Sequence, residues 1–155
     1  MDCMVDDQHF MDLALAQAAA AATMGEVPVG AVVVHDGVVI SQAHNRREVD
    51  ADPTAHAELI AMREAAAKLG DWRLEECTVY VTLEPCAMCA GLMVNARVQR
   101  CVYGTTDPRG GFLGTLGDLS SHPVLNHRFE VTAGIRSEES AEELRAFFRK
   151  VRAKK

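Results

Sequence analysis

One histidine and two cysteines stand in two short motifs of this chain. His56 opens the motif His56-Ala57-Glu58, and Pro85 precedes the motif Cys86-Ala87-Met88-Cys89. Imidazole and thiolate are ligands that zinc prefers, and two cysteines separated by two residues can bind one tetrahedral ion. Structural zinc is normally held by four protein ligands, whereas catalytic zinc has three and leaves the fourth position to water. The motifs therefore predict a catalytic zinc site held by His56, Cys86 and Cys89.

Glu58 follows the histidine by two residues. Residues two apart on a regular helix point to nearly opposite sides, so His56 and Glu58 can share one ion only at a helix start, or if the glutamate reaches back. We therefore interpret Glu58 as an unligated carboxylate that moves a proton from zinc-bound water to a substrate nitrogen. Zinc lowers the pKa of such a water to about 7. This combination predicts hydrolytic attack on an electron-poor carbon that carries an amine.

Two helices are expected to position these motifs. Asp52-Pro53-Thr54 is typical of a helix start, and residues 55–69 are strong helix formers, which places His56 in a first turn. Pro85 precedes a second periodic run, which places both thiols in a first helical turn. By itself, a C-x-x-C pair in an apolar helix is more often a pair of core residues or a redox pair. An H-x-E motif by itself is a weak signal for a metal site. The two motifs together, each preceded by a proline that can start a helix, favour a zinc site.

Short apolar strands alternate with helices along the rest of the chain, and Asp36-Gly37 predicts a tight hairpin. This alternation predicts one domain over residues 1–155, a three-layer α/β/α sandwich with a mixed sheet. The other expected elements are a helix at 7–24, strands at 29–35, 38–43, 77–82, 100–103 and 129–132, a loop with a short helix between the last two strands, and a helix at 137–151.

Composition limits the class of protein. The chain has 155 residues, 48% of them hydrophobic, and no apolar run near the roughly 20 residues that span a bilayer. We expect no membrane partner. The first residues lack the basic and apolar regions of a signal peptide. Five cysteines, an odd number, argue against a disulfide framework and for a reducing compartment. The expected location is the cytoplasm.

Charge is distributed unevenly. The net charge is −6, yet Arg145 to Lys155 carry six basic residues and no acid. A basic segment on an acidic body is what a local phosphate-binding face would show, because nucleic-acid affinity comes from local neutralisation. The alternative is a solvated terminal helix that is simply rich in Lys and Arg.

The motifs are those of a known group of enzymes. The chain resembles zinc-dependent nucleobase deaminases, whose signature is H-x-E followed by P-C-x-x-C, and among them the bacterial tRNA adenosine deaminases. The resemblance covers nearly the whole chain and implies a cytidine deaminase-like fold with a five-stranded sheet, one Zn²⁺ per subunit, a homodimer and no organic cofactor. It rests on residues 26–32, Asn45-Arg46, His56-Ala57-Glu58, residues 83–89, Tyr103-Gly104, Asp107, His122-Pro123 and Asn126-His127.

The resemblance also implies a role for individual residues. His56, Cys86 and Cys89 match the zinc ligands, and Glu58 matches the proton shuttle. Asn45 matches the residue that hydrogen-bonds the flipped base, although it could be only a loop residue. Further matches are Val27 and Pro28, which pack against the base, the pocket wall at Ala57, Leu83 and Glu84, the loop with Asp107 and Arg109 beside the nucleic acid, and Phe147-Phe148 of the last helix. One or both of these phenylalanines could instead be core, and Phe148 is taken as the substrate contact.

Three functions are compatible with these residues. The first is hydrolytic deamination of the wobble adenosine (A34) of a tRNA anticodon to inosine by a zinc-activated hydroxide, with the anticodon stem-loop as partner. The second is deamination of a free base or nucleoside such as guanine or cytosine. The third is a non-enzymatic zinc-stabilised module. Arg109 and the basic end favour the first, and Glu58 argues against the third, because a structural site needs no unligated carboxylate.

Overall fold

The computed structural model describes residues 3–154, with side chains from residue 6 onward. Within this part of the chain, four helices and five strands follow one another in the expected order. Most bounds lie within two residues of the expected ones, and the first helix begins about four residues earlier. The elements are α1 Cys3–Thr23, β1 Gly30–His35, β2 Val38–His44, α2 Ala57–Leu69, β3 Cys77–Leu83, α3 Ala87–Asn95, β4 Arg100–Thr105, β5 Glu130–Ala133 and α4 Ser137–Ala153.

The strands form one mixed sheet in the order β2-β1-β3-β4-β5. β1 runs antiparallel to β2 and β3, whereas β4 is parallel to β3 and β5. Asp36 and Gly37 make the turn between β1 and β2 with φ angles of 51° and 74°. Positive φ at both positions is what a two-residue hairpin turn requires. The mixed five-stranded sheet is therefore confirmed.

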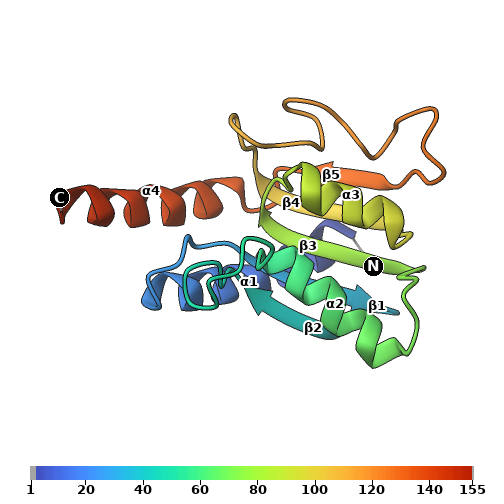
Figure 1. Ribbon diagram of the computed structural model, residues 1–155, viewed down its shortest axis with the longest axis horizontal. Helices are drawn as coiled ribbons and strands as arrows, with labels where there is room; N and C mark the ends of the chain where they lie inside the picture. The colour runs from blue at the N-terminus through green and yellow to red at the C-terminus, as the bar shows by residue number, and fades with distance from the viewer. Residues whose placement is uncertain (1–2, 155) are drawn as a thin grey trace.

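Helices cover both faces of the sheet (Figure 1). α2 and α3 lie on one face, and α1 and α4 pack on the other. Successive residues of β1 alternate between these layers: Ala31 and Val33 belong to the core under α2 and α3, and Val32 and Val34 to the core under α1. This alternation is the period of two that a strand buried on both faces must show. The three-layer α/β/α arrangement is confirmed. No helix in the described part of the chain is long and apolar enough to cross a membrane.

The loop between β4 and β5 differs from the expectation. The short helix expected there is wrong, because the described residues of this loop form turns and one isolated bridge between Leu113 and Asp118. The backbone N–H groups of Asp107, Leu113 and Thr115 donate to the side chain of Glu84. Groups that bond to a distant carboxylate are not available for a helical ladder, so tertiary contacts decide the shape of this loop.

Asp7 ties α1 to the sheet. Its carboxylate accepts hydrogen bonds from the hydroxyl of Tyr80 at 2.7 Å and from two nitrogens of Arg100 at 2.9 and 2.7 Å. Burial by itself raises the pKa of Asp7, but the hydrogen bonds from Arg100 and Tyr80 and the charge of Arg100 together outweigh it, so the pKa is lowered from the usual 3.8. The folded chain therefore stabilises Asp7 in its ionised form.

We predict that Asp7→Asn lowers the free energy of unfolding at pH 7 by about 3 kcal/mol, because the Arg100 charge loses its partner. Since the pKa of Asp7 is lower in the folded than in the unfolded chain, this contribution is present above about pH 4 and is lost as the pH falls further. Denaturant unfolding of both proteins from pH 7 to pH 3 measures the difference, which should shrink at low pH.

Asp12→Asn is the matched control for this prediction. Asp12 also pairs with an arginine, Arg136, but its side chain is 53% exposed. An exposed pair contributes less than about 1 kcal/mol. Equal losses of stability in the two variants at pH 7 would contradict the role assigned to Asp7.

Candidate active site

His56 and Glu58 face one cavity because α2 begins between them. His56 is the N-cap residue, with extended backbone angles of φ −80° and ψ 147°, and the helix starts at Ala57. The expectation that His56 lies inside the first turn is therefore wrong. The extended N-cap removes the geometric reason for the two side chains to point apart, and both line the cavity. Glu58 is 4% exposed.

Cys86 occupies the same position on the next helix. It is the N-cap of α3, with φ −75° and ψ 176°, and Cys89 lies in the first turn. Only one of the two thiols is thus inside the turn that was expected to hold both. The Nδ1 atom of His56 is 3.7 Å from the Sγ atoms of both cysteines. A tetrahedral zinc ion with ordinary bond lengths separates such N and S ligands by about 3.6 Å.

The three donors form a compact group. The ligand atoms of His56, Cys86 and Cys89 all lie within 4.8 Å of one another, and the carboxylate of Glu58 is not a member of this group. Two thiols and one imidazole suit a soft divalent cation such as zinc. The residues present therefore fit one zinc ion with three protein ligands.

The hydrogen bond between the two thiols shifts their pKa values in opposite directions. A hydrogen bond with Cys89, followed by the contact with His56, lowers the pKa of Cys86 to about 3. The same bond, together with burial, raises the pKa of Cys89. The hydrogen bond to Cys86 also raises the pKa of His56, while burial and, to a smaller extent, the positive charge of Arg47 oppose this rise. A cation bound here would displace the protons of these ligands.

Glu58 is the carboxylic acid next to this donor group, and its side chain is buried away from solvent. Burial raises its pKa to about 7. Its carboxyl group therefore gains and loses a proton more readily near neutral pH than an exposed glutamate does. A group of this kind can act as either acid or base in a reaction at the cavity.

A cavity of about 710 Å³ opens onto these side chains. Its volume lies within the range of roughly 300–1,000 Å³ that is usual for small-molecule sites. Pro28, Ala57 and Cys89 are buried and do not line it. Phe147 is not among the lining residues either. The other residues to which the sequence assigns a role do line the cavity, namely Val27, Asn45, His56, Glu58, Leu83, Glu84, Cys86, Asp107, Arg109 and Phe148.

Asn45 is fixed at the wall of this cavity. Its side-chain oxygen accepts a hydrogen bond of 2.9 Å from the backbone N–H of Ala57, the first residue of α2. Because an N–H can bond only to the oxygen of the amide, the nitrogen of Asn45 is left as a donor. Asn45 is 7% exposed, so this donor can act only through the cavity.

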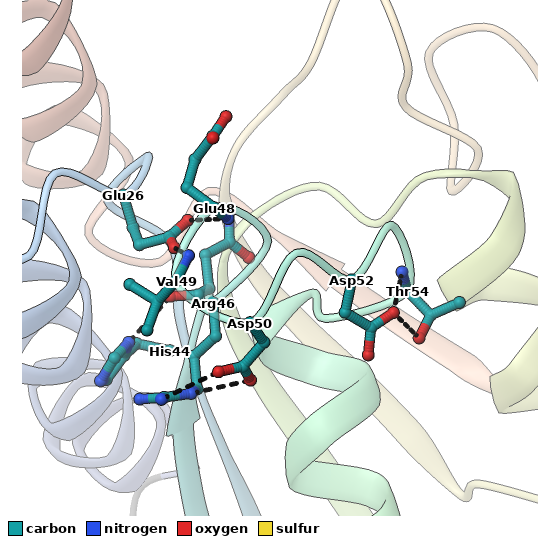
Figure 2. A network of polar contacts seen from close by, with 9 residues as sticks. Glu26, His44, Arg46, Glu48, Val49, Asp50, Asp52 and Thr54 are labelled. Carbon is teal, nitrogen blue, oxygen red and sulfur yellow. Dashed lines mark hydrogen bonds and ion pairs between the residues drawn. The ribbon is translucent and has the colours of Figure 1, made fainter.

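The loop after β2 carries its own network of polar contacts (Figure 2). The buried carboxylate of Glu26 accepts hydrogen bonds from the backbone N–H groups of Glu48 at 3.2 Å and Val49 at 2.7 Å. Arg46 forms a bidentate pair with Asp50, with both distances 3.0 Å. Figure 2 shows these contacts converging on one short segment, which holds the loop next to Asn45 in a defined shape.

The carboxylate of Glu84 lines the cavity, but its oxygens are occupied by hydrogen bonds from a loop. It accepts hydrogen bonds from the N–H groups of Asp107, Leu113 and Thr115 and from the hydroxyl of Thr115. Gly111 packs on it so closely that an added Cβ would lie 2.3 Å from the Glu84 carboxyl carbon. The side chain of Glu84 thus holds the loop after β4.

Sequence reasoning missed several residues of the cavity. The charged ones are Arg47, Arg145 and Arg152, and Arg47 directly follows the Asn45-Arg46 motif, which was the available signal. The basic end of the chain pointed to Arg145 and Arg152 as a group but not individually. The remaining lining residues are Val29, Thr106, Pro108 and Leu144.

Comparison with known proteins shows which families this chain resembles in sequence and structure. The MafB19-like deaminase family matches residues 5–152. The tRNA-specific adenosine deaminase of Bacillus subtilis is 48% identical, over 98% of this chain and 94% of the relative. A chain solved in studies of A-to-I editing by tRNA:A34 deaminases at the wobble position of transfer RNA has a TM-score of 0.85 at 46% identity, covering 88% of this chain and 99% of that one. A guanine deaminase from Bacillus subtilis has a TM-score of 0.61 at 37% identity and covers 63% of each chain.

The extent of these matches separates the two kinds of relative. The guanine deaminase accounts for less than two thirds of the chain. The tRNA-specific relative matches nearly all of it, at higher identity. On this evidence, the chain belongs to the tRNA-specific adenosine deaminase family.

Proposed function

We propose that this protein deaminates the wobble adenosine, A34, of a tRNA anticodon to inosine. One observation carries the chemistry: the buried carboxylate of Glu58 lines the same cavity as His56 and Cys86, which form one donor group with Cys89. The names of the relatives supply the substrate.

The chain's own residues account for the proton transfers. His56, Cys86 and Cys89 would hold zinc, which when bound supplies Lewis-acid activation of water at neutral pH. Glu58 accepts a proton from the water that adds to C6 of the adenine. It delivers that proton to N1, then accepts the second proton from the new hydroxyl group on C6 and delivers it to the exocyclic amine, which leaves as ammonia. Adenosine and water thereby give inosine and ammonia, and the reaction needs no organic cofactor.

Asn45 and the apolar residues of the wall would hold the base. The amide nitrogen of Asn45 donates to an acceptor on the base, while Val27 and Leu83 pack against its faces. The base must leave its stack to enter, which costs a few kcal/mol and least in a single-stranded loop. An anticodon loop meets this condition, so the substrate and the buried position of Glu58 are compatible.

Three arginines at the cavity are free to bind phosphate. Arg47, Arg109 and Arg152 line the cavity, and no carboxylate among the described residues lies within 4.0 Å of their nitrogens. By contrast, Arg145 pairs with Glu142. An unpaired guanidinium can bind a phosphate oxygen pair without first breaking an ion pair. These three residues, with Phe148 as a stacking surface, would contact the RNA around the target base.

Two further expectations stay predictions. The homodimer rests on the family resemblance, and the exposed apolar side chains of Met88, Leu116 and Val124 offer surface for it. The cytoplasmic location follows from the substrate, because mature tRNA is found there. Sedimentation analysis of the purified protein measures the subunit number.

The decisive test is the product. We predict that the zinc-loaded protein converts an A34-containing anticodon stem-loop to the inosine form, measured by mass spectrometry, and that Glu58→Gln lowers the rate at least ~100-fold because the proton carrier is lost. Glu64→Gln, an exposed change on the same helix, is the control. Product from free adenosine, cytidine or guanine alone would move the chain to the small-molecule deaminases. Zinc bound with no product from any substrate would favour the structural module.

Metal content tests the donor group separately. We predict that Cys86→Ala and His56→Ala each lose most of the bound zinc, because two remaining ligands hold it weakly. Elemental analysis of protein dialysed against buffer measures this. Cys101→Ala, a buried thiol outside the group, should retain one zinc ion per chain. Full zinc occupancy in Cys86→Ala would refute its role as a ligand.

Salt dependence tests the arginines. We predict that Arg47→Gln reduces the slope of log affinity against log salt by about 0.7, the value for one phosphate contact on a single strand. The measurement uses the stem-loop and a Glu58→Gln background, so that the RNA stays unreacted. Arg46→Gln is the control, because Arg46 is already paired with Asp50. Equal slopes for the Arg47 variant and its parent would exclude the contact.

A further inference from the structure

Two buried glutamates do not take part in the proposed chemistry. Glu26 and Glu84 are each 2% exposed. Asp7, another buried acid, is paired with Arg100, but neither Glu26 nor Glu84 has an arginine, lysine or histidine nitrogen within 4.0 Å among the described residues. Burying a carboxylate is unfavourable unless hydrogen bonds compensate it. The hydrogen-bond partners of Glu26 and Glu84 should therefore indicate the role of each carboxylate.

Glu84 bonds to one loop only. Its two oxygens accept hydrogen bonds from Asp107 N–H at 3.0 Å, from Leu113 N–H and Thr115 N–H at 3.1 Å, and from the Thr115 hydroxyl. Gly111 lies directly over the carboxylate, where any side chain would collide with it. One charged group thus holds both ends of the segment that carries Asp107 and Arg109.

Glu26 bonds to the loop on the other side of the cavity. Its oxygens accept from Glu48 N–H and Val49 N–H, as Figure 2 shows. These residues directly follow Arg47, and they precede Asp50, whose carboxylate holds Arg46. Glu26 comes from the segment after α1, so this contact joins two stretches of chain that are distant in sequence.

Both loops lack the regular backbone hydrogen bonds that would fix their shape. Neither belongs to a helix or a strand in this region, so no regular ladder of hydrogen bonds fixes it. Both nevertheless contribute an arginine to the cavity, Arg47 from one and Arg109 from the other. A carboxylate that binds several N–H groups of a loop fixes its backbone before any ligand arrives, which lowers the ordering cost of binding.

We infer that Glu26 and Glu84 are positioning residues of the substrate site, which hold the Arg47 loop and the Asp107–Arg109 loop in their binding shapes. The inference rests on the proposed function for the identity of the ligand, single-stranded RNA. The loop-holding itself does not depend on it. The two glutamates act through the loops, because the hydrogen bonds of their side chains go to loop groups and not to His56, Cys86 or Cys89.

Amide hydrogen exchange, read by NMR on the zinc-loaded full chain, tests the loop-holding directly. In Glu84→Gln an NH₂ group replaces one of the two accepting oxygens and opposes its N–H donors. Exchange should therefore speed up at least tenfold at Asp107 or at Leu113 and Thr115, with Glu48 and Val49 unchanged. Glu26→Gln should give the reverse pattern, so each variant is the control for the other. Unchanged exchange, or a rise spread over the whole sheet in either variant, would overturn the inference.

Kinetics on the anticodon stem-loop test the link to substrate. Each variant should raise KM at least tenfold while kcat falls less than KM rises, because the loops and not the proton carrier are disturbed. Asp7→Asn, which weakens the fold away from the cavity, is the matched control and should leave KM unchanged. A rise of KM in Asp7→Asn equal to that of the two variants would show that general destabilisation is the cause. A loss confined to kcat would also overturn the inference.

Gly111→Ala provides a second route to the same loop. The added methyl group collides with the carboxylate of Glu84, so it should reproduce the exchange pattern and the KM change of Glu84→Gln. If the parent protein makes no inosine, the proposed function fails while the exchange experiment still decides the loop-holding. If the parent is active and the exchange pattern is absent, only the positioning role fails.

Discussion

The extended backbone at the start of two helices is the constraint on which the site depends. The side chain of an N-cap residue normally accepts a hydrogen bond from a free N–H group of its own helix. Loss of such a cap lowers stability by about 1 kcal/mol. His56 and Cys86 make no side-chain cap bond. Their side chains are therefore available as metal donors. For α2 the missing bond is partly supplied by Asn45, which accepts from the N–H of Ala57 across a gap of twelve residues.

The sheet topology brings the other parts to the same edge. β1 starts where β2 and β3 end, because it is antiparallel to both, and β4 ends beside β3 because the two are parallel. The segment before β1, the segments that follow β2 and β4, and the last residue of β3 consequently meet at one place and supply Val27, Asn45, Thr106 and Leu83 to the cavity. The same edge carries the starts of α2 and α3. A site at the carboxyl ends of parallel strands is usual for α/β sheets.

Local patterns were sufficient to predict much of this molecule. Asp36-Gly37, the helix-forming run before Gly70 and the alternation of short apolar strands gave the elements and the layered fold. The candidate donors were predicted because zinc ligands have a recognisable type and spacing, and the structure brings the three side chains together. The start of α2 was misplaced because Ala55 and His56 are compatible with a helix. In the structure, contacts of Ala55 and Ala57 with Asn45 and Arg46 accompany a helix that begins only at Ala57.

What the sequence could not reveal depends on partners distant along the chain. Glu26 bonds to residues 22 and 23 positions later, and Glu84 to residues up to 31 positions later. No local pattern marks such a carboxylate as buried. Arg46 and Arg47 are adjacent and identical in type, and only the fold distinguishes the one paired with Asp50 from the one at the cavity.

The position of α4 has a consequence for how the protein is made. All the proposed metal donors lie within the first 89 residues, whereas Leu144, Arg145, Phe148 and Arg152 complete the cavity from the last helix. During synthesis from the amino end, the segments with the proposed donors emerge well before the helix that completes the cavity. Under the proposed function, the zinc ligands are thus present on the growing chain before the residues that would contact RNA.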